Sequence, residues 1–272
     1  MAGNAVVSTA PELRYACDLG LLPTRLADRF VALDCDPSTL AFVRQAPHQR
    51  HGWLLTQAQV LLSSLLGDFE ANGLLGTYPM HLLSTGQWRT LLGSRPGGSL
   101  LDAGAGSGDV TIELMPLFDE VQTTESSWAM ARRLRRRGLR CTRTDLLDDE
   151  VPEAPYGTIA CLNVLDRCDR PLRLLTKLVG AVESGGRLLL SLPLPYSPCV
   201  YDGSNLRSPN GPLPLADTSN WEQSLVSLVR DVLTPLELSV DGWSRAPYLS
   251  GGDSAHELYA LDAAVVVTRV PT

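Results

Sequence analysis

An acidic residue followed by three alternating glycines is the feature of this sequence best suited to bind a ligand. These residues are Asp102, Gly104, Gly106 and Gly108, within residues 100–108. An apolar segment precedes the glycines and a helix-like segment follows them, which is typical of a strand-to-helix turn. Glycine lets the backbone turn sharply and lets a ligand approach it without an intervening Cβ. We therefore expect a ligand at the start of the helix, where open α/β sheets bind ligands.

The spacing of the glycines distinguishes between cofactors. A dinucleotide site needs Gly-x-Gly-x-x-Gly, but the third position after Gly106 is Asp109. A phosphate-binding P-loop would end in Gly-Lys-Ser/Thr, which is absent. The carboxylate of Asp102 suits a ligand that carries an amino group and a sulfonium, as S-adenosylmethionine does. The turn therefore predicts an S-adenosylmethionine site, with S-adenosylhomocysteine as the product.

Two further acids follow the next two expected strands. Glu125 ends the second strand, 17 residues after Gly108. A carboxylate at that position can accept hydrogen bonds from both hydroxyls of a ribose. Asp145 follows the third strand and is placed to accept the adenine amino group, although the backbone of Leu146 could make the same contact.

From residue 99 onward the sequence alternates between strand and helix patterns, which predicts a mostly parallel sheet. Seven strands are expected, over residues 99–103, 120–124, 139–144, 156–162, 187–192, 236–243 and 259–269. No helix pattern separates the last two, so we expect them to form an antiparallel hairpin. The fold class is therefore α/β, with a seven-stranded, Rossmann-like sheet that ends in a C-terminal hairpin.

The first 95 residues show helix-like patterns and no convincing alternating strand. We expect residues 1–95 to form an N-terminal helical extension that packs on a core domain of residues 96–272. Helices are expected over residues 24–33, 38–44, 56–69 and 84–92. Asp36 and either Ser84 or Thr85 are candidate N-terminal caps. Residues 193–214, which are rich in Pro, Gly, Ser and Asn, are expected to form a long loop.

The sequence resembles the class I methyltransferases, and more specifically the DREV family of methyltransferase-like 9 proteins. The segments that carry the resemblance are residues 30–33, 72–76, 100–108, 160–169 (Ala-Cys-Leu-Asn-Val-Leu-Asp-Arg-Cys-Asp), 220–222, 247–249 and 261–262. They run from about residue 30 to the C-terminus, and the cysteine-flanked segment is far more specific than the glycine turn. The resemblance implies S-adenosylmethionine-dependent methylation of the N-pros (π) nitrogen of histidines. The implied partners are proteins or peptides with His-x-His motifs, in which x is small.

Asn163 and Asp166 fit that activity, because they follow the fourth strand and so border both the cofactor and the acceptor. Methyl transfer is an in-line displacement, so the enzyme must present a lone pair along the reaction axis. A carboxylate that accepts the N–H of one imidazole nitrogen leaves the other nitrogen as the nucleophile. It also stabilises the imidazolium and can collect its proton. We assign this role to Asp166, and to Asn163 a bridging contact with cofactor and acceptor. The alternative is that both residues cap the helix that starts near Pro171.

Arg245 and Tyr248 are two further candidates for the acceptor pocket, since they lie between the last two expected strands. The four histidines, His48, His51, His81 and His256, have no carboxylate or cysteine that completes a metal site, so no metal is expected. We interpret them as surface residues, and the arginine-rich residues 132–140 as a solvated helix face.

The composition is that of an ordinary globular chain, with 44% apolar residues and a net charge of −7. This charge argues against a surface that coats nucleic acid. No apolar run reaches the roughly 18 residues of a membrane span, and the N-terminus lacks a signal-peptide pattern. Six irregularly spaced cysteines are interpreted as reduced, mostly buried thiols. We therefore expect a monomer in the cytoplasm, although the family resemblance also implies endomembrane residence for animal members.

Three functions remain open at this stage. The first is a protein-histidine methyltransferase, and the second is a methyltransferase for a small molecule or another protein side chain. The third is a non-catalytic scaffold that binds S-adenosylmethionine, against which the retained Asp102, Glu125, Asn163 and Asp166 argue. Enzymes that methylate amino groups of adenine or glutamine usually carry Asn/Asp-Pro-Pro-Tyr where this chain has residues 163–166, which contain neither proline nor an aromatic residue.

Overall fold

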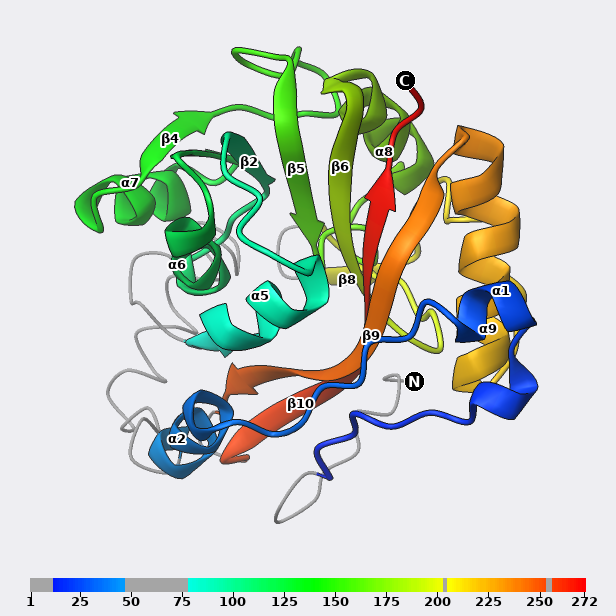
Figure 1. The fold of residues 1–272 in the computed structure, drawn as a ribbon. Helices are drawn as coiled ribbons and strands as arrows, with labels where there is room; N and C mark the ends of the chain where they lie inside the picture. Colours follow the sequence, from blue (N-terminus) through cyan, green and yellow to red (C-terminus); the bar gives the residue numbers. More distant parts are fainter. Residues whose placement is uncertain (1–11, 47–77, 203–204, 253–255) are drawn as a thin grey trace.

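The computed structural model describes residues 12–46, 78–202, 205–252 and 256–272, and an eight-stranded sheet forms its centre (Figure 1). The order of the strands is β1-β9-β10-β6-β5-β2-β3-β4. Their bounds are β1 (Met80–His81), β2 (Ser99–Ala103), β3 (Glu120–Glu125), β4 (Arg140–Arg143), β5 (Tyr156–Leu162), β6 (Val182–Pro193), β9 (Ser239–Gly251) and β10 (Leu258–Arg269).

Strands β4, β3, β2, β5 and β6 are parallel to their neighbours, whereas β10 pairs antiparallel with both β6 and β9. This arrangement confirms the predicted α/β fold with a C-terminal antiparallel hairpin. From β2 the chain winds outward to β3 and β4, and then continues from β5 to β6 on the other side. The point where the strand order reverses therefore lies between β2 and β5, and open α/β sheets bind ligands at the carboxyl ends of the strands there.

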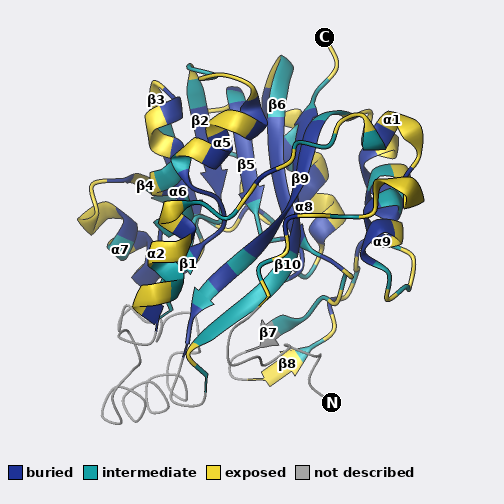
Figure 2. Cartoon of the chain, turned by 60° about the horizontal axis from the view of Figure 1, so that its bottom comes forward, coloured by how far each residue is buried: buried dark blue, intermediate teal, exposed yellow. Residues whose placement is uncertain are grey.

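Helices cover both faces of the sheet. They are α1 (Thr24–Ala27), α2 (Pro37–Gln45), α5 (Thr85–Leu92), α6 (Asp109–Leu114), α7 (Trp128–Arg136), α8 (Pro171–Gly180) and α9 (Trp221–Ser227). Successive residues of a strand point to opposite faces, so Leu100 joins an apolar cluster with Trp88 of α5. Its neighbour Leu101 joins a second cluster, which contains Leu175 of α8 and Leu225 of α9. Figure 2 shows buried residues concentrated on the strands between these helices.

The N-terminal helices follow the sequence prediction only in part. Asp36 caps α2 by accepting a hydrogen bond from the backbone N–H of Thr39 at 2.8 Å, and Ser84 forms a capping box with Gln87 at the start of α5. The predicted helix over residues 24–33 is wrong beyond Ala27, because the chain there leaves the helix to pair with β9. The predicted helix over residues 56–69 lies outside the described residues.

The chain after Ala27 pairs with β9 through backbone and aromatic contacts. The N–H of Val31 donates to the carbonyl of Trp243 at 2.8 Å, and the ring centroids of Phe30 and Trp243 lie 4.8 Å apart. These contacts bridge more than 200 positions of sequence, so a local helix pattern could not reveal them.

Three strand predictions also need correction. The sheet has eight strands instead of seven, because the two-residue β1 joins the edge through the pair Met80 and Ser250. Strand β9 does not end at Trp243 but continues to Gly251, so Arg245 and Tyr248 lie within the strand and not in a loop. The expected loop after β6 contains a small separate hairpin, β7 (Val200–Asp202) and β8 (Asn205–Arg207).

Helix α9 leads into two further helical segments before β9. It continues as a π-helix, η4 (Leu228–Leu233), and ends in a 3-10 turn, η5 (Thr234–Leu236). No helix among the described residues is both long and apolar enough to cross a bilayer.

The burial of His81 and of the cysteines corrects two interpretations made from the sequence. His81 is only 6% exposed, its Nε2 lies 3.0 Å from Thr39 Oγ1, and its ring stacks on Phe42, so it is not a surface residue. His48 and His51 lie outside the described residues. All six cysteines are free, but two are buried and four partly buried, so they are not mostly buried. The arginines of residues 132–140 are exposed or partly exposed, as predicted.

Candidate cofactor and acceptor site

The glycine turn joins the end of β2 to the start of α6, as the sequence predicted. Gly104, Gly106 and Gly108 all have positive φ, at 74°, 55° and 80°. A Cβ on Gly108 would lie 2.7 Å from leucine side chains of the neighbouring helix and strand, so this glycine permits close packing. Among the described residues, a Cβ on Gly106 would meet only the Cε of Met80, at 3.9 Å. Gly106 is therefore the position where the turn leaves room for a ligand.

Asp102 is buried below the turn, with 3% of its surface exposed. One of its carboxylate oxygens, Oδ2, accepts a hydrogen bond from the Thr111 hydroxyl of α6 at 2.6 Å. Burial is the main cause of a rise in the pKa of Asp102 to about 6. The structure therefore gives Asp102 a partner that the sequence analysis missed, and its contact with the amino group of the cofactor stays a prediction.

Glu125 fastens the turn to the end of β3. Its Oε2 accepts the backbone N–H of Gly106 at 2.9 Å, and its Oε1 accepts that of Ser127 at 3.0 Å. Burial raises the pKa of this carboxyl. A carboxylate offers about four acceptor positions, so Glu125 can hold the turn and still accept the hydroxyls of a ribose. This fits the predicted role, because the same side chain borders the open position at Gly106.

Asp145 lies after β4, farther along the same edge of the sheet. It is exposed, and its Oδ1 accepts the backbone N–H of Leu147 at 2.9 Å in a tight turn. The structure shows no hydrogen bond between Asp145 and the other candidate residues, so its contact with adenine stays a prediction.

Asn163 and Asp166 carry buried polar atoms without a partner. Both side-chain amide atoms of Asn163 and the Oδ1 of Asp166 are buried and form no hydrogen bond with any residue that the structure describes. The other oxygen of Asp166 lies 3.2 Å from Nε of Arg167, and burial raises the pKa of this carboxyl. Buried polar groups are normally paired, so three unpaired atoms within four residues indicate a place for a polar ligand.

The alternative, that these two residues cap helix α8, is excluded. The N-cap of α8 is Arg170, and no side chain forms a capping hydrogen bond there. Asn163 instead adopts a positive φ of 54° directly after β5, and its backbone N–H donates to the carbonyl of Ser191 at 3.0 Å. A Cβ on Gly104 would lie 2.9 Å from Val164, so the segment that holds Asn163 lies against the glycine turn.

Tyr248 and Met80 connect the two halves of the site. The hydroxyl of Tyr248 donates to the sulfur of Met80, whose backbone N–H donates to Oδ2 of Asp109 at 3.1 Å. Burial is the main cause of a raised pKa of Tyr248, and the charge of Asp166 adds to the rise. Met80 also lies beside Gly106, and the sequence analysis missed it because a two-residue strand has no detectable pattern.

Arg245 is not brought together with Tyr248. The two lie three positions apart along β9, so their side chains point to opposite faces of the sheet. The Nε of Arg245 donates to Asp262 at 2.8 Å, its Nη1 lies 3.5 Å from Glu222, and its guanidinium lies 4.5 Å from the ring centroid of Trp221. These contacts give Arg245 a set of partners within the protein, and its contact with the substrate stays a prediction.

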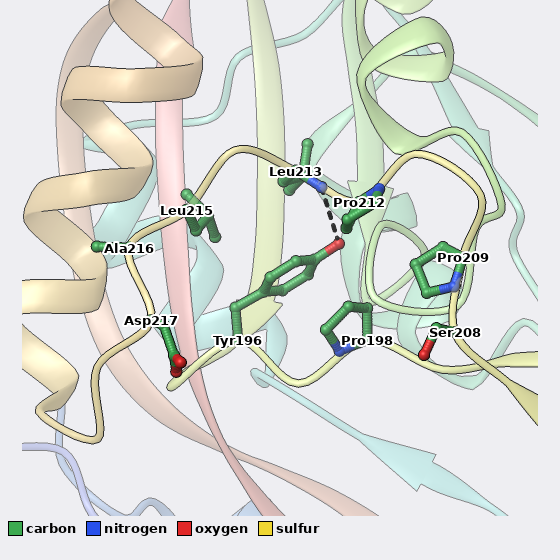
Figure 3. Close-up of a pocket in the computed structure, with 9 residues that line it drawn as sticks. All are labelled: Tyr196, Pro198, Ser208, Pro209, Pro212, Leu213, Leu215, Ala216 and Asp217. Carbon is green, nitrogen blue, oxygen red and sulfur yellow. Dashed lines mark hydrogen bonds between the residues drawn. The ribbon is translucent and has the colours of Figure 1, made fainter.

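A hollow of about 310 Å³ lies beside the acceptor segment, within the long loop after β6 (Figure 3). Tyr196 forms its centre, and the hydroxyl of this residue lies 3.4 Å from the carbonyl of Leu165. The hollow is therefore one hydrogen bond away from the backbone next to Asp166.

The strand order and the glycine turn at the switch point define a class I methyltransferase. A model of the DREV methyltransferase family matches residues 14–270, and the chain belongs to this family. It is therefore an S-adenosylmethionine-dependent methyltransferase, which confirms the predicted family and cofactor.

Solved structures of methyltransferases are also similar to the chain. The N-methyltransferase NodS from Bradyrhizobium japonicum, in complex with S-adenosylhomocysteine, is 16% identical over 67% of this chain and 82% of its own, with a TM-score of 0.43. The magnesium protoporphyrin IX methyltransferase from Synechocystis, also with S-adenosylhomocysteine bound, is 14% identical over 86% of this chain and 95% of its own, with a TM-score of 0.45. At such low similarity, neither structure indicates the substrate of this chain.

Proposed function

We propose that this chain is a protein-histidine N-pros methyltransferase that acts on His-x-His motifs of protein substrates. The observation that carries the proposal is the buried carboxylate of Asp166, which has one oxygen paired with Arg167 and the other without a partner. A neutral imidazole needs one acceptor of this kind, because its N–H must be satisfied where water is excluded.

The unpaired oxygen of Asp166 would accept the N–H of the τ nitrogen, which leaves the lone pair on the π nitrogen. That π nitrogen would accept the methyl group, and S-adenosylhomocysteine would be the leaving group. The ring then carries a positive charge, which the carboxylate stabilises, and the τ proton passes to Asp166 and from there to solvent. The raised pKa of Asp166 makes it a better proton acceptor than an ordinary carboxylate.

S-adenosylmethionine, when bound, supplies a methyl group on a positively charged sulfur. The open turn at Gly106 and the remaining acceptor positions of Glu125 fit this cofactor, with Asp102 and Asp145 as the proposed partners of its amino group and its adenine. The unpaired amide of Asn163 can donate to one ligand and accept from the other. Tyr248 would close the pocket against water.

The test is transfer of a labelled methyl group to a peptide with alternating histidines. A peptide with those histidines replaced is the substrate control, and Asp166→Asn is the key variant. Glu183→Gln is its matched control, because Glu183 is an exposed acid at the opposite end of the sheet, near the start of β6. We expect π-methylhistidine in the histidine peptide alone, and a loss of roughly a hundredfold or more in kcat/KM with Asp166→Asn.

Other results would contradict the proposal. Calorimetric binding of S-adenosylhomocysteine without any transfer to the histidine peptide would refute the histidine assignment. Label on the τ nitrogen would also refute it, because Asp166 is proposed to accept the N–H of that nitrogen.

We further propose a cytoplasmic protein, which the six free thiols support.

A further inference from the structure

The long loop between β6 and α9 forms the hollow of about 310 Å³. This hollow is separate from the glycine turn, none of whose residues line it. Three prolines, Pro198, Pro209 and Pro212, form much of its wall together with Tyr196 and Leu215. Figure 3 shows the Tyr196 ring across the middle of the hollow, with Asp217 toward one end and Ser208 and Pro209 toward the other.

The wall of the hollow is partly apolar, where the prolines and the leucines lie, and partly polar. The Tyr196 hydroxyl is already engaged, since it donates to the Leu165 carbonyl and accepts the N–H of Leu213 at 3.3 Å. The side chain therefore offers its ring and not its hydroxyl to an occupant. Burial is the main cause of a rise in the pKa of Tyr196 to about 12, and the charge of Asp166 adds to it. This places the acceptor carboxylate within electrostatic reach of the hollow.

The loop is fastened to the segment that carries Asp166. The N–H of Cys199 donates to the carbonyl of Asp166 at 2.9 Å. The carboxylate of Asp169 accepts from Arg207 and from the side chain of Asn210, both at 2.7 Å. These hydrogen bonds lower the pKa of Asp169 to about 2. The hollow is thus formed before any substrate binds, which reduces the entropic cost of binding.

One charge in the wall of the hollow has no partner. Asp217 is exposed, and within the described parts of the chain no cation or hydrogen-bond donor is paired with its carboxylate. The nearby Asp169 is neutralised by Arg207, which leaves Asp217 as the free charge at this site. Apolar groups of the prolines and of the Tyr196 ring beside a carboxylate are complementary to a side chain that has an apolar stem and a cationic end.

We propose that this hollow is a subsite for a lysine or arginine side chain of the protein substrate, within about four residues of the methylated histidine. The proposal rests on the proposed function. The alkyl stem lies along the prolines and over the face of the Tyr196 ring, where a cation is also attracted. The cationic end reaches Asp217. An extended peptide rises about 3.3 to 3.6 Å per residue, so four residues span the short distance from Asp166 to the loop.

The test is a series of peptides with one alternating-histidine core. Lysine, norleucine or glutamate is placed at each of the four positions on either side, and kcat/KM is measured for the whole enzyme. Norleucine keeps the apolar stem and removes the charge. At one or two positions, lysine should exceed norleucine by about three- to fivefold, as expected for an exposed ion pair. The ratio should fall with added salt.

Two variants assign the effect to the hollow. Asp217→Asn should bring the ratio of lysine to norleucine close to one, and Asp217→Lys should favour glutamate at the same position. Glu183→Gln removes a charge far from the loop and should preserve the wild-type ratio. Equal rates for all peptides, or a lysine preference that survives Asp217→Lys, would overturn the subsite while transfer to the core peptide continues. Failure of transfer to every peptide would overturn the proposed function, and the subsite with it.

Discussion

Replacing Asp102 with asparagine should stabilise the protein and weaken its binding of the cofactor. Asp102 is buried, and among the described residues its side chain has one hydrogen-bond partner, the Thr111 hydroxyl. An asparagine oxygen can accept the same bond at nearly the same volume. The variant therefore keeps the packing below the glycine turn and removes the cost of burying a charge.

The magnitude follows from the pKa of Asp102, which burial raises from 3.8 to about 6. One pKa unit corresponds to about 1.4 kcal/mol, so the raised pKa lowers the free energy of unfolding by about 3 kcal/mol at pH 8 and by about half as much at pH 5. A raised pKa means that the neutral acid favours the folded state. This stability is fully present below pH 3.8 and is lost as the pH rises through about 6.

Urea unfolding of the cofactor-free protein at pH 5 and pH 8 measures this difference. Asp102→Asn should be more stable than wild type at both values, with a gain at pH 8 about twice that at pH 5. Glu183→Gln, an exposed acid, should show neither gain. Calorimetry at pH 8 should show S-adenosylhomocysteine bound roughly tenfold more weakly by Asp102→Asn, since a hydrogen bond to a charged group is lost.

Two results would refute this reasoning. A loss of stability at pH 8 would mean that the carboxylate holds the turn together and is not a source of destabilisation. Unchanged binding of S-adenosylhomocysteine would mean that Asp102 supports the backbone of the turn without contacting the amino group.

Three further predictions concern the turn, the buried arginine and the acceptor carboxylate. Gly108→Ala should lower the free energy of unfolding by about 3 kcal/mol, because it adds a Cβ clash to an unfavourable φ. Gly138 has a similar φ of 82° but open space around the Cβ position, so Gly138→Ala should lower this free energy by only about 1 kcal/mol. Urea unfolding measures both values. Arg245→Met leaves two largely buried acids unpaired and should lower the free energy of unfolding by about 3 kcal/mol. Arg269 is half-exposed, so Arg269→Met should lower it by less than about 1 kcal/mol. At acid pH, the plot of log(kcat/KM) for a histidine peptide against pH should have a slope of two, because both the imidazole and Asp166 must be deprotonated. In Asp166→Asn only the imidazole titrates, so the slope should be one.

The parts of the fold that depend on local pattern could be predicted from the sequence. Strands β2, β3 and β5 and the turn at residues 104–108 lie within one residue of their expected bounds, because strand alternation and glycine spacing are properties of neighbouring residues. The carboxyl-end positions of Glu125 and Asn163 follow from the same pattern, since parallel strands all end at one edge of the sheet.

The rest depended on contacts between residues far apart in the sequence. Strand β9 was expected to end at Trp243, because the Arg-Ala-Pro that follows is typical of a loop. Pro247 is accommodated in register opposite Asp262, and Arg245 is neutralised by Asp262 and by Glu222 of α9. Neither the register of Pro247 nor the ion pairs of Arg245 can be predicted from the neighbouring residues. The same holds for Met80, which reaches the site through its pairing with the far end of β9.

The unpaired atoms at Asn163 and Asp166 decide between the readings that the sequence left open. In the sequence, a cap on the next helix was the alternative role of these two residues, because Asn and Asp are also favoured at helix N-termini. In the fold, Asn163 adopts a positive φ directly after its strand and Arg170 begins the helix, so the capping role is removed. What remains is a carboxylate and an amide in a buried place where a polar group costs free energy unless something binds it. Such a cost persists at a site whose partner is a ligand, and under the proposed function the N–H of a neutral imidazole would supply the donor that Asp166 lacks.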